Sequence, residues 1–461
     1  MKRLLRLVSA AAKQPAGRLP QVIRCRRELD GAYDLLEERQ VRAEAVLSSC
    51  VQAAVRRCRS SPFAYVPVDG SSLSMSGEKR KEAFGAVGSH KLGGRGLKVM
   101  TALVVTPDGV PQGLGDQKWW MRPQRKRLSK CTSRAPSDRE SRFWLQAISD
   151  TRTRFGKLAP GTRPWFQLDR EGDSLAILDD ARTQGYWLTT RARLNRRLRF
   201  PGEPLRRYRN RKAPLLRDHM AKQVCLGTTV VDVKSGDANR VRKAILEVRA
   251  ASVFLERSDL KTSAVLQPVP INAVHVGELN PTSSERLDWL LLTTAPIETF
   301  EDAKLVVAGY AMRWRIEEFH RTWKSGGCNV EETQLRHPDS VKLWATILAA
   351  VATRIERLKY LARTQPELPA TTEFDASELE AIRLLKRRHD ASAAIPSAAQ
   401  MTIGEATRFI AAIGGHLGRP SDGHAGSTTI GRGLDHVQVA ADVIRLLKTG
   451  LSPPSETDSR R

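Results

Sequence analysis

Three acidic residues stand where an active site could use them. Asp69, in VPVDGSS, and Asp169, in FQLDREGD, each close a predicted β-strand, and Glu317 lies on a predicted helix. Carboxylates placed in this way can hold two Mg²⁺ ions about 3.5–4 Å apart, so that one activates an attacking hydroxyl and the other steadies the leaving oxygen of a phosphodiester. Such hard oxygen ligands suit Mg²⁺ or Mn²⁺ better than zinc. The alternative role for either aspartate is a turn cap.

The segment that carries Glu317 predicts one continuous helix over 310–326, because no helix breaker interrupts it before the final glycine. Apolar residues are expected on its core-facing side, namely Leu305, Ala308, Met312, Ile316, Phe319 and Trp323. On the opposite side, Tyr310, Arg313, Glu317 and Lys324 project within roughly 60° of one another. This polar face places an acid between two cations and a phenol. An i,i+4 ion pair of Arg313 with Glu317 on a solvated surface is the alternative reading.

The predicted elements around the acids follow a recognisable order. A strand from Phe63 to Asp69 is followed by two strands within 96–120, joined at the PDG turn of residues 107–109. A helix begins near Phe143, and a short buried strand ends at Asp169 before a further helix. Three strands, then a strand and a helix, then a late helix with an acid is the layout of a ribonuclease-H-like domain. The fold class predicted is therefore α/β.

The segment between the second and third acids has a different character. Residues 186–289 are β-rich, and within them the span 191–212 is unusually basic. This span suits a surface that faces phosphates, although a solvated loop has the same composition. Residues 1–60 and the C-terminal part of the chain have helical patterns.

Composition favours a polyanionic partner. The 461 residues include 76 Lys and Arg against 50 Asp and Glu, a net charge of +26, and nucleic acid is the commonest partner of so basic a protein. The six cysteines form no CxxC pair, which indicates ordinary thiols in a reducing compartment. No apolar run approaches the length of a membrane span. We expect a cytoplasmic, nucleoid-associated protein with no membrane partner.

The spacing Tyr-x2-Arg-x3-Glu-x6-Lys resembles the YREK signature of the bacterial cut-and-paste DDE transposases of the IS-four group. Further blocks resemble this family in the same order along the chain, from about Leu35 to at least Arg363. These blocks are DGSSLS from Asp69, WWMRP from Trp119, LDREGD from Leu168, WLLLTTAP from Trp289 and RWRIEEFHRTWKSG from Arg313. Five ordered blocks over some 300 residues make a chance match implausible.

The resemblance implies a role for each matching position. Asp69, Asp169 and Glu317 would be the catalytic acids that bind two Mg²⁺ or Mn²⁺ ions, while Tyr310, Arg313 and Lys324 would contact phosphates at the cleaved transposon end. In this family an aromatic side chain stacks on a base flipped out of the duplex. Trp289 lies at the matching place, with a core tryptophan as the alternative. Arg191 matches an arginine that grips the DNA backbone.

The resemblance also implies a domain scheme. It is a ribonuclease-H-like core interrupted by a β-rich insertion, with helical regions at both ends: 1–60 DNA-binding region, 61–185 first part of the core, 186–285 insertion, 286–345 second part of the core with the YREK helix, and 346–461 dimerisation region. Two departures stand out, because Gly70 replaces a hydroxyl residue and the N-terminal region resembles only the latter half of the family's.

The leading hypothesis is a DNA transposase. A homodimer in a synaptic complex would join two double-stranded transposon ends, cut them by 3′ nicking and hairpin formation, and transfer them into target DNA. The alternative is a catalytically idle, N-terminally shortened relative that regulates transposition by binding DNA or pairing with full-length subunits. Loss of an acid or of a YREK residue would favour that alternative, and none is lost.

Overall fold

The computed structural model describes residues 2–75, 83–88, 93–122, 140–203, 213–234, 241–258, 265–281, 286–392 and 394–448. Its α-helices are α1 (Lys2–Lys13), α2 (Leu19–Val22), α3 (Arg26–Glu37), α4 (Ala43–Arg56), α5 (Arg142–Leu158), α6 (Leu175–Thr183), α7 (Leu216–Ala221), α8 (Phe300–Met312), α9 (Trp314–Lys324), α10 (Pro338–Thr364), α11 (Ala376–His389), α12 (Ile403–Ile413) and α13 (Ser427–Lys448). The N-terminal and C-terminal regions are helical, as predicted.

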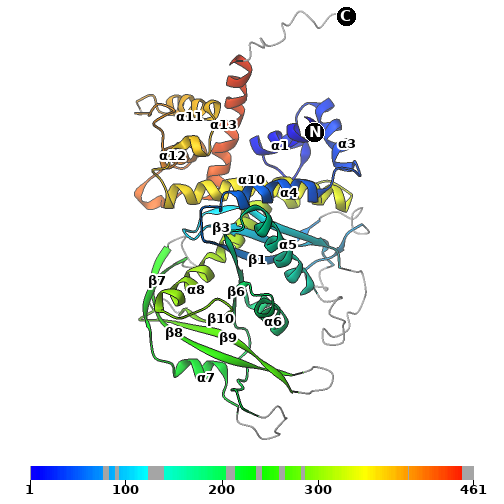
Figure 1. Ribbon diagram of the computed structural model, residues 1–461. Helices are drawn as coiled ribbons and strands as arrows, with labels where there is room; N and C mark the ends of the chain where they lie inside the picture. Colours follow the sequence, from blue (N-terminus) through cyan, green and yellow to red (C-terminus); the bar gives the residue numbers. More distant parts are fainter. Residues whose placement is uncertain are drawn as a thin grey trace, which may run out of the picture.

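The strands form one large mixed sheet (Figure 1). They are β1 (Phe63–Ser74), β2 (Gly85–Ala86), β3 (Arg95–Val105), β4 (Pro111–Trp120), β5 (Arg163–Leu168), β6 (Trp187–Arg191), β7 (Gly227–Lys234), β8 (Val241–Ser258), β9 (Val265–Glu278) and β10 (Asp288–Thr293). Their order across the sheet is β2-β3-β1-β5-β6-β10-β9-β8-β7, and β4 also pairs with β3. The turn predicted between β3 and β4 is confirmed.

The centre of the sheet has the pattern expected of a ribonuclease-H-like core. β1 pairs antiparallel with β3 and parallel with β5, and β5 pairs parallel with β6. Helix α5 packs on β1, β3, β4 and β5, while α8 and α9 contact β1. The mixed sheet with its covering helices is consistent with the predicted fold. β7, β8 and β9 occupy the predicted insertion but extend the same sheet through β10, and the helix α7 within that segment was not predicted.

The structure corrects the expected end of β1. The strand continues beyond Asp69 to Ser74, because the antiparallel pairing with β3 runs on from Asp69 opposite Thr101 to Ser74 opposite Gly96. Asp69 therefore lies within a strand, at the point where pairing with β5 has ended and pairing with β3 continues.

The helix predicted over 310–326 is also wrong in detail, because α8 and α9 meet at Arg313. The Arg313 N–H donates to the Tyr310 carbonyl at 3.1 Å, and the Ile316 N–H donates to the Arg313 carbonyl at 3.3 Å. Bonds that span three residues tighten the backbone into a 3₁₀-like turn. The predicted faces shift as a result: Leu305, expected in the core, is exposed, whereas Tyr310 and Arg313, expected on a polar face, are buried.

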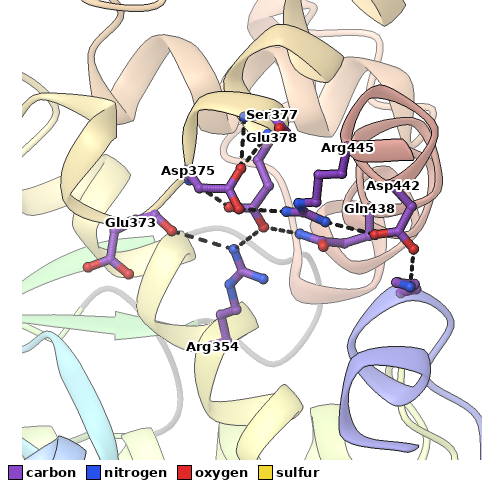
Figure 2. Close-up of polar contacts among 9 residues, drawn as sticks. Arg354, Glu373, Asp375, Ser377, Glu378, Gln438, Asp442 and Arg445 are labelled. Carbon is purple, nitrogen blue, oxygen red and sulfur yellow. Dashed lines mark hydrogen bonds and ion pairs between the residues drawn. The ribbon is translucent and has the colours of Figure 1, made fainter. Parts of the chain in front are cut away.

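The C-terminal helices are held together by an ion-pair network that Figure 2 displays. Asp375 caps the start of α11 and also pairs with Arg445 of α13 at 2.6 Å. Glu378 of α11 pairs with Arg354 of α10 at 2.9 Å and accepts a hydrogen bond from Gln438 of α13. These contacts fix α10, α11 and α13 as one bundle, in which α11 and α13 lie on the far side of α10 from the sheet (Figure 1).

Two predictions from the sequence concern the state of the cysteines and the presence of a membrane span. The five cysteines in the described ranges are free thiols, and Cys131 lies outside those ranges. No described helix combines the length and the apolar character that a membrane crossing requires.

Asp435 of α13 makes stability depend on pH. Burial raises the pKa of its carboxyl to about 8, and its Oδ1 is buried without a hydrogen-bond partner. Because the folded-state pKa lies above the unfolded one, near 3.8, this group contributes stability at low pH that is lost as pH rises through about 8. We expect Asp435→Asn to be more stable than the wild type at pH 8.5, by about 1–3 kcal/mol, and to keep a smaller part of this advantage at pH 5, because the wild type gains stability as pH falls from about 8 toward 3.8. Thermal unfolding at both pH values, with the exposed Asp339→Asn as control, measures the difference.

Candidate active site

Asp69 and Asp169 lie side by side at the point where the parallel pairing of β1 with β5 ends. Val68 of β1 is in register with Leu168 of β5, so the two aspartates that follow occupy neighbouring positions on strands about 4.8 Å apart. Asp169 caps the short 3₁₀ turn Arg170–Gly172, and its Oδ1 accepts the backbone N–H of Glu171 at 2.8 Å. The turn-cap role that was the alternative for this residue is therefore present. One carboxylate oxygen serves the cap and leaves the other for further contacts.

The pKa of Asp69 is affected by the charges of the other two predicted acids. Burial, together with the charges of Asp169 and Glu317, raises the pKa of its carboxyl to about 7, although Arg313 opposes the shift. About a fifth of the side chain, 20%, is exposed. The three predicted acids thus share one electrostatic environment, in which a positive charge would be favoured.

Glu317 faces Arg313 across one turn of backbone. The Arg313 Nη2 donates to the Glu317 Oε1 at 2.7 Å, which is the i,i+4 ion pair considered above as the alternative. The pair is only partly open to solvent, because the Arg313 side chain is 10% exposed and the Glu317 side chain 34%. The Arg313 guanidinium also lies over the Tyr310 ring, 5.9 Å from its centroid.

Tyr310 links the helix to two further predicted residues. Its ring packs edge-on against Trp289 of β10, with centroids 5.1 Å apart, and both side chains are buried. Burial raises the pKa of the Tyr310 phenol, while Arg313 and Arg191 oppose the shift. Arg191, at the end of β6, donates to the Asp288 carbonyl at 2.9 Å. In this state Trp289 occupies the core position that was the alternative for it.

Lys324 lies at the far end of α9 and is engaged by another acid. Its Nζ is 3.4 Å from the Glu331 Oε1, which also accepts the Ser74 N–H of β1 at 2.7 Å. Of the basic span 191–212, residues 204–212 lie outside the described part of the chain.

Two residues near the acids were not singled out from the sequence. His320 follows Glu317 by one turn, and its Nδ1 is 3.8 Å from the Asp69 Oδ2. Burial, reinforced by Lys324, lowers the pKa of this imidazole to about 3, so the ring is neutral. Lys98 of β3 is close enough to Asp69 and Glu171 for both to act on its pKa, which burial lowers. The helical spacing of His320 from Glu317 is a usable signal, whereas Lys98 requires the β1–β3 register.

The donor set suits a hard divalent cation by its chemistry, since all three acids offer carboxylate oxygens. Across the described residues, however, no group of three or more His, Cys, Asp or Glu side chains is arranged to hold a metal ion as it stands. The Glu317 carboxylate is instead engaged by the Arg313 guanidinium.

Family models assign the class of protein. Residues 137–354 match the transposase DDE domain, a range that contains Asp169 and Glu317 and begins after Asp69. The chain is accordingly a DDE transposase, an enzyme of the polynucleotidyl-transferase type, and enzymes of this class use divalent metal ions. Residues 350–451 match the transposase Tn5 dimerisation domain. The two matches together support a transposase of the Tn5 kind that acts on DNA and forms dimers.

Proposed function

We propose that this chain is a cut-and-paste transposase of the IS-four group, similar to that of the kanamycin-resistance composite transposon. It would nick the 3′ strand at each transposon end, form a hairpin and transfer the ends into target DNA in the bacterial nucleoid. The observation that carries the proposal is the juxtaposition of Asp69 and Asp169 on paired strands, with Glu317 close enough to act on the pKa of Asp69.

Asp69, Asp169 and Glu317 would hold two Mg²⁺ or Mn²⁺ ions, which would supply Lewis-acid activation of the reacting oxygens. The acids themselves would fix the position of the scissile phosphate relative to the strand edge. Water would add to phosphorus and displace the 3′ oxygen, which leaves as a hydroxyl. That hydroxyl would then attack the phosphodiester of the opposite strand and displace the 3′ oxygen of the flanking DNA, so that one phosphodiester is exchanged for another and the transposon end closes as a hairpin.

The YREK residues would position DNA around this edge. Arg313 and Lys324 flank Glu317 and offer cations to the backbone, and contacts of this kind set the register of the duplex. Arg191 adds a third cation, beside Tyr310. Trp289 would have to leave its contact with Tyr310 to stack on a flipped base, so we propose that DNA binding opens this pair.

The test of the function is a labelled duplex that carries the flanking element's own end, incubated with purified protein and Mg²⁺ or Mn²⁺. We expect metal-dependent nicked and hairpin products on denaturing gels. A preparation that dimerises and binds DNA without cleaving it would instead favour the regulator hypothesis.

A stripe on α13 is the proposed contact between two copies of the chain. Val439, Val443, Leu446 and Leu447 are apolar and each more than half exposed. They recur at helical spacing within the segment that matches the dimerisation domain, and water-exposed apolar stripes of this kind are typical of association surfaces.

We expect Val443→Asp to convert a dimer into a monomer, because the change places a charge in the centre of this stripe. Sedimentation equilibrium measures the mass, and circular dichroism confirms the fold. The matched control is Leu384→Asp, which places the same charge at an apolar, 50% exposed residue of α11, outside the stripe. Unaltered dimerisation of Val443→Asp would place the interface elsewhere.

A further inference from the structure

The side of α9 that faces away from Arg313 makes a second set of polar contacts, all of them buried. Thr322, 2% exposed, donates its hydroxyl to the Glu356 Oε1 of α10. Glu318, the neighbour of Glu317, accepts a hydrogen bond from the Tyr360 hydroxyl of α10. The helix that carries the third acid is therefore tied to α10 by hydrogen bonds in addition to apolar packing.

The same Glu356 oxygen serves the C-terminal bundle. Ser427, the first residue of α13, donates its hydroxyl to the Glu356 Oε1 at 2.6 Å. Lys359 pairs with the other oxygen of Glu356 and donates to the Ser427 Oγ at 3.1 Å. One carboxylate, fully buried at 0% exposure, thus joins α9, α10 and α13.

A second branch of contacts fixes the start of α9. The Arg315 Nη1 donates to the Tyr360 Oη at 2.8 Å, and its Nε donates to the Gly109 carbonyl in the β3–β4 turn at 3.0 Å. The guanidinium also stacks on the Tyr360 ring, 3.6 Å from its centroid. Hydrogen bonds to α10 therefore hold both ends of α9.

Buried charges are a costly means of packing helices. Removing a carboxylate and an ammonium from water costs several kcal/mol per ion, and well-packed apolar residues often give equal or greater stability. What such a network does supply is a defined geometry, because each hydrogen bond has a preferred length and direction. A device that fixes the rotation of α9 fixes the direction in which Glu317 points.

We propose that Glu356 is a positioning residue for Glu317, and that it makes the placement of this acid depend on the docking of α13. Two hydroxyls, one from each helix, share a single oxygen atom, so displacement of α13 alters the acceptor on which α9 depends. The inference rests on the proposed function for its catalytic consequence, although the link between the helices stands apart from it.

The experiment compares Glu356→Gln with Glu378→Gln. Glu378 is likewise a buried acid that joins α10 to α13, within the network of Figure 2, and among the described residues it forms no hydrogen bond or ion pair with α9. Hydrogen–deuterium exchange of residues 314–324 reports on α9 without requiring activity. Nicking of the labelled end at a series of Mn²⁺ concentrations reports on the acid itself.

We expect Glu356→Gln to raise amide exchange in α9 and to increase the Mn²⁺ concentration for half-maximal nicking about tenfold, with DNA affinity unchanged. Glu378→Gln should destabilise the bundle yet leave both readouts at wild-type values. Thr322→Val and Ser427→Ala should each reproduce part of the effect, and the double variant should fall short of their sum. Equal exchange in α9 for the two glutamate variants would overturn the proposal. Absence of nicking by the wild type would count against the proposed function alone.

Discussion

Glu317→Gln should abolish nicking and hairpin formation, with a fall in rate of about 1,000-fold or more. Loss of one metal-binding carboxylate removes several kcal/mol of transition-state stabilisation, and each 1.4 kcal/mol is a factor of ten in rate. The glutamine keeps the shape of the side chain and an oxygen that can accept from Arg313, so the fold and DNA binding should persist. Rates come from single-turnover assays on the labelled end, and affinity from gel shifts in Ca²⁺.

The matched control is Glu301→Gln on the adjoining helix α8, where the side chain is 72% exposed and pairs only with Lys304 among the described residues. It removes the same charge without approaching the acids, and its rate should equal that of the wild type. Substantial nicking by Glu317→Gln would remove this residue from the catalytic set, whatever its resemblance to the family's glutamate.

Arg313→Met should affect metal binding and cleavage differently. The affinity for Mn²⁺ should be kept or raised, whereas the rate of nicking should fall. The arginine opposes the rise in the Asp69 pKa and engages Glu317, so its removal frees a carboxylate and withdraws a positive charge. Mn²⁺ should bind as tightly as in the wild type or up to about tenfold more tightly. Nicking should nonetheless fall by about 10–100-fold, because a charge-assisted hydrogen bond to phosphate contributes about 1.5–3 kcal/mol.

Titration calorimetry with Mn²⁺ in the absence of DNA measures the first quantity, and single-turnover nicking measures the second. Arg321→Met, which removes an exposed cation from the same helix, should leave both unaffected. Weaker Mn²⁺ binding by Arg313→Met would mean that the arginine supports the acids and does not compete with the metal for them.

Much of the fold was predictable because its elements have strong local signals. The β3–β4 hairpin has a PDG turn between apolar runs, and the start of α5 near Phe143 follows from its apolar period. The positions of Asp69 and Asp169 at neighbouring strands followed from the order of elements, and the register of β1 with β5 places them together.

The errors arise where tertiary contacts override local pattern. The apolar period of residues 305–326 predicted one straight helix with one solvent-exposed face. The turn at Arg313 instead rotates the two halves, and Trp289 covers Tyr310. Likewise, nothing local extends β1 past Asp69, since its continuation depends on a partner strand some thirty residues later. The ion pair of Arg313 with Glu317 was considered as a surface contact because burial of an arginine is not evident from spacing.

Glu331 contacts both Lys324 and the Ser74 amide, and this shared contact bears on how Lys324 could change its anionic partner. A phosphate that takes over Lys324 does not leave a stranded carboxylate, because the backbone N–H of Ser74 still donates to Glu331. Lys324 is thus held by Glu331, an internal anion that keeps a hydrogen-bond donor when the lysine leaves it. Under the proposed function, a DNA phosphate would replace Glu331 as the partner of Lys324.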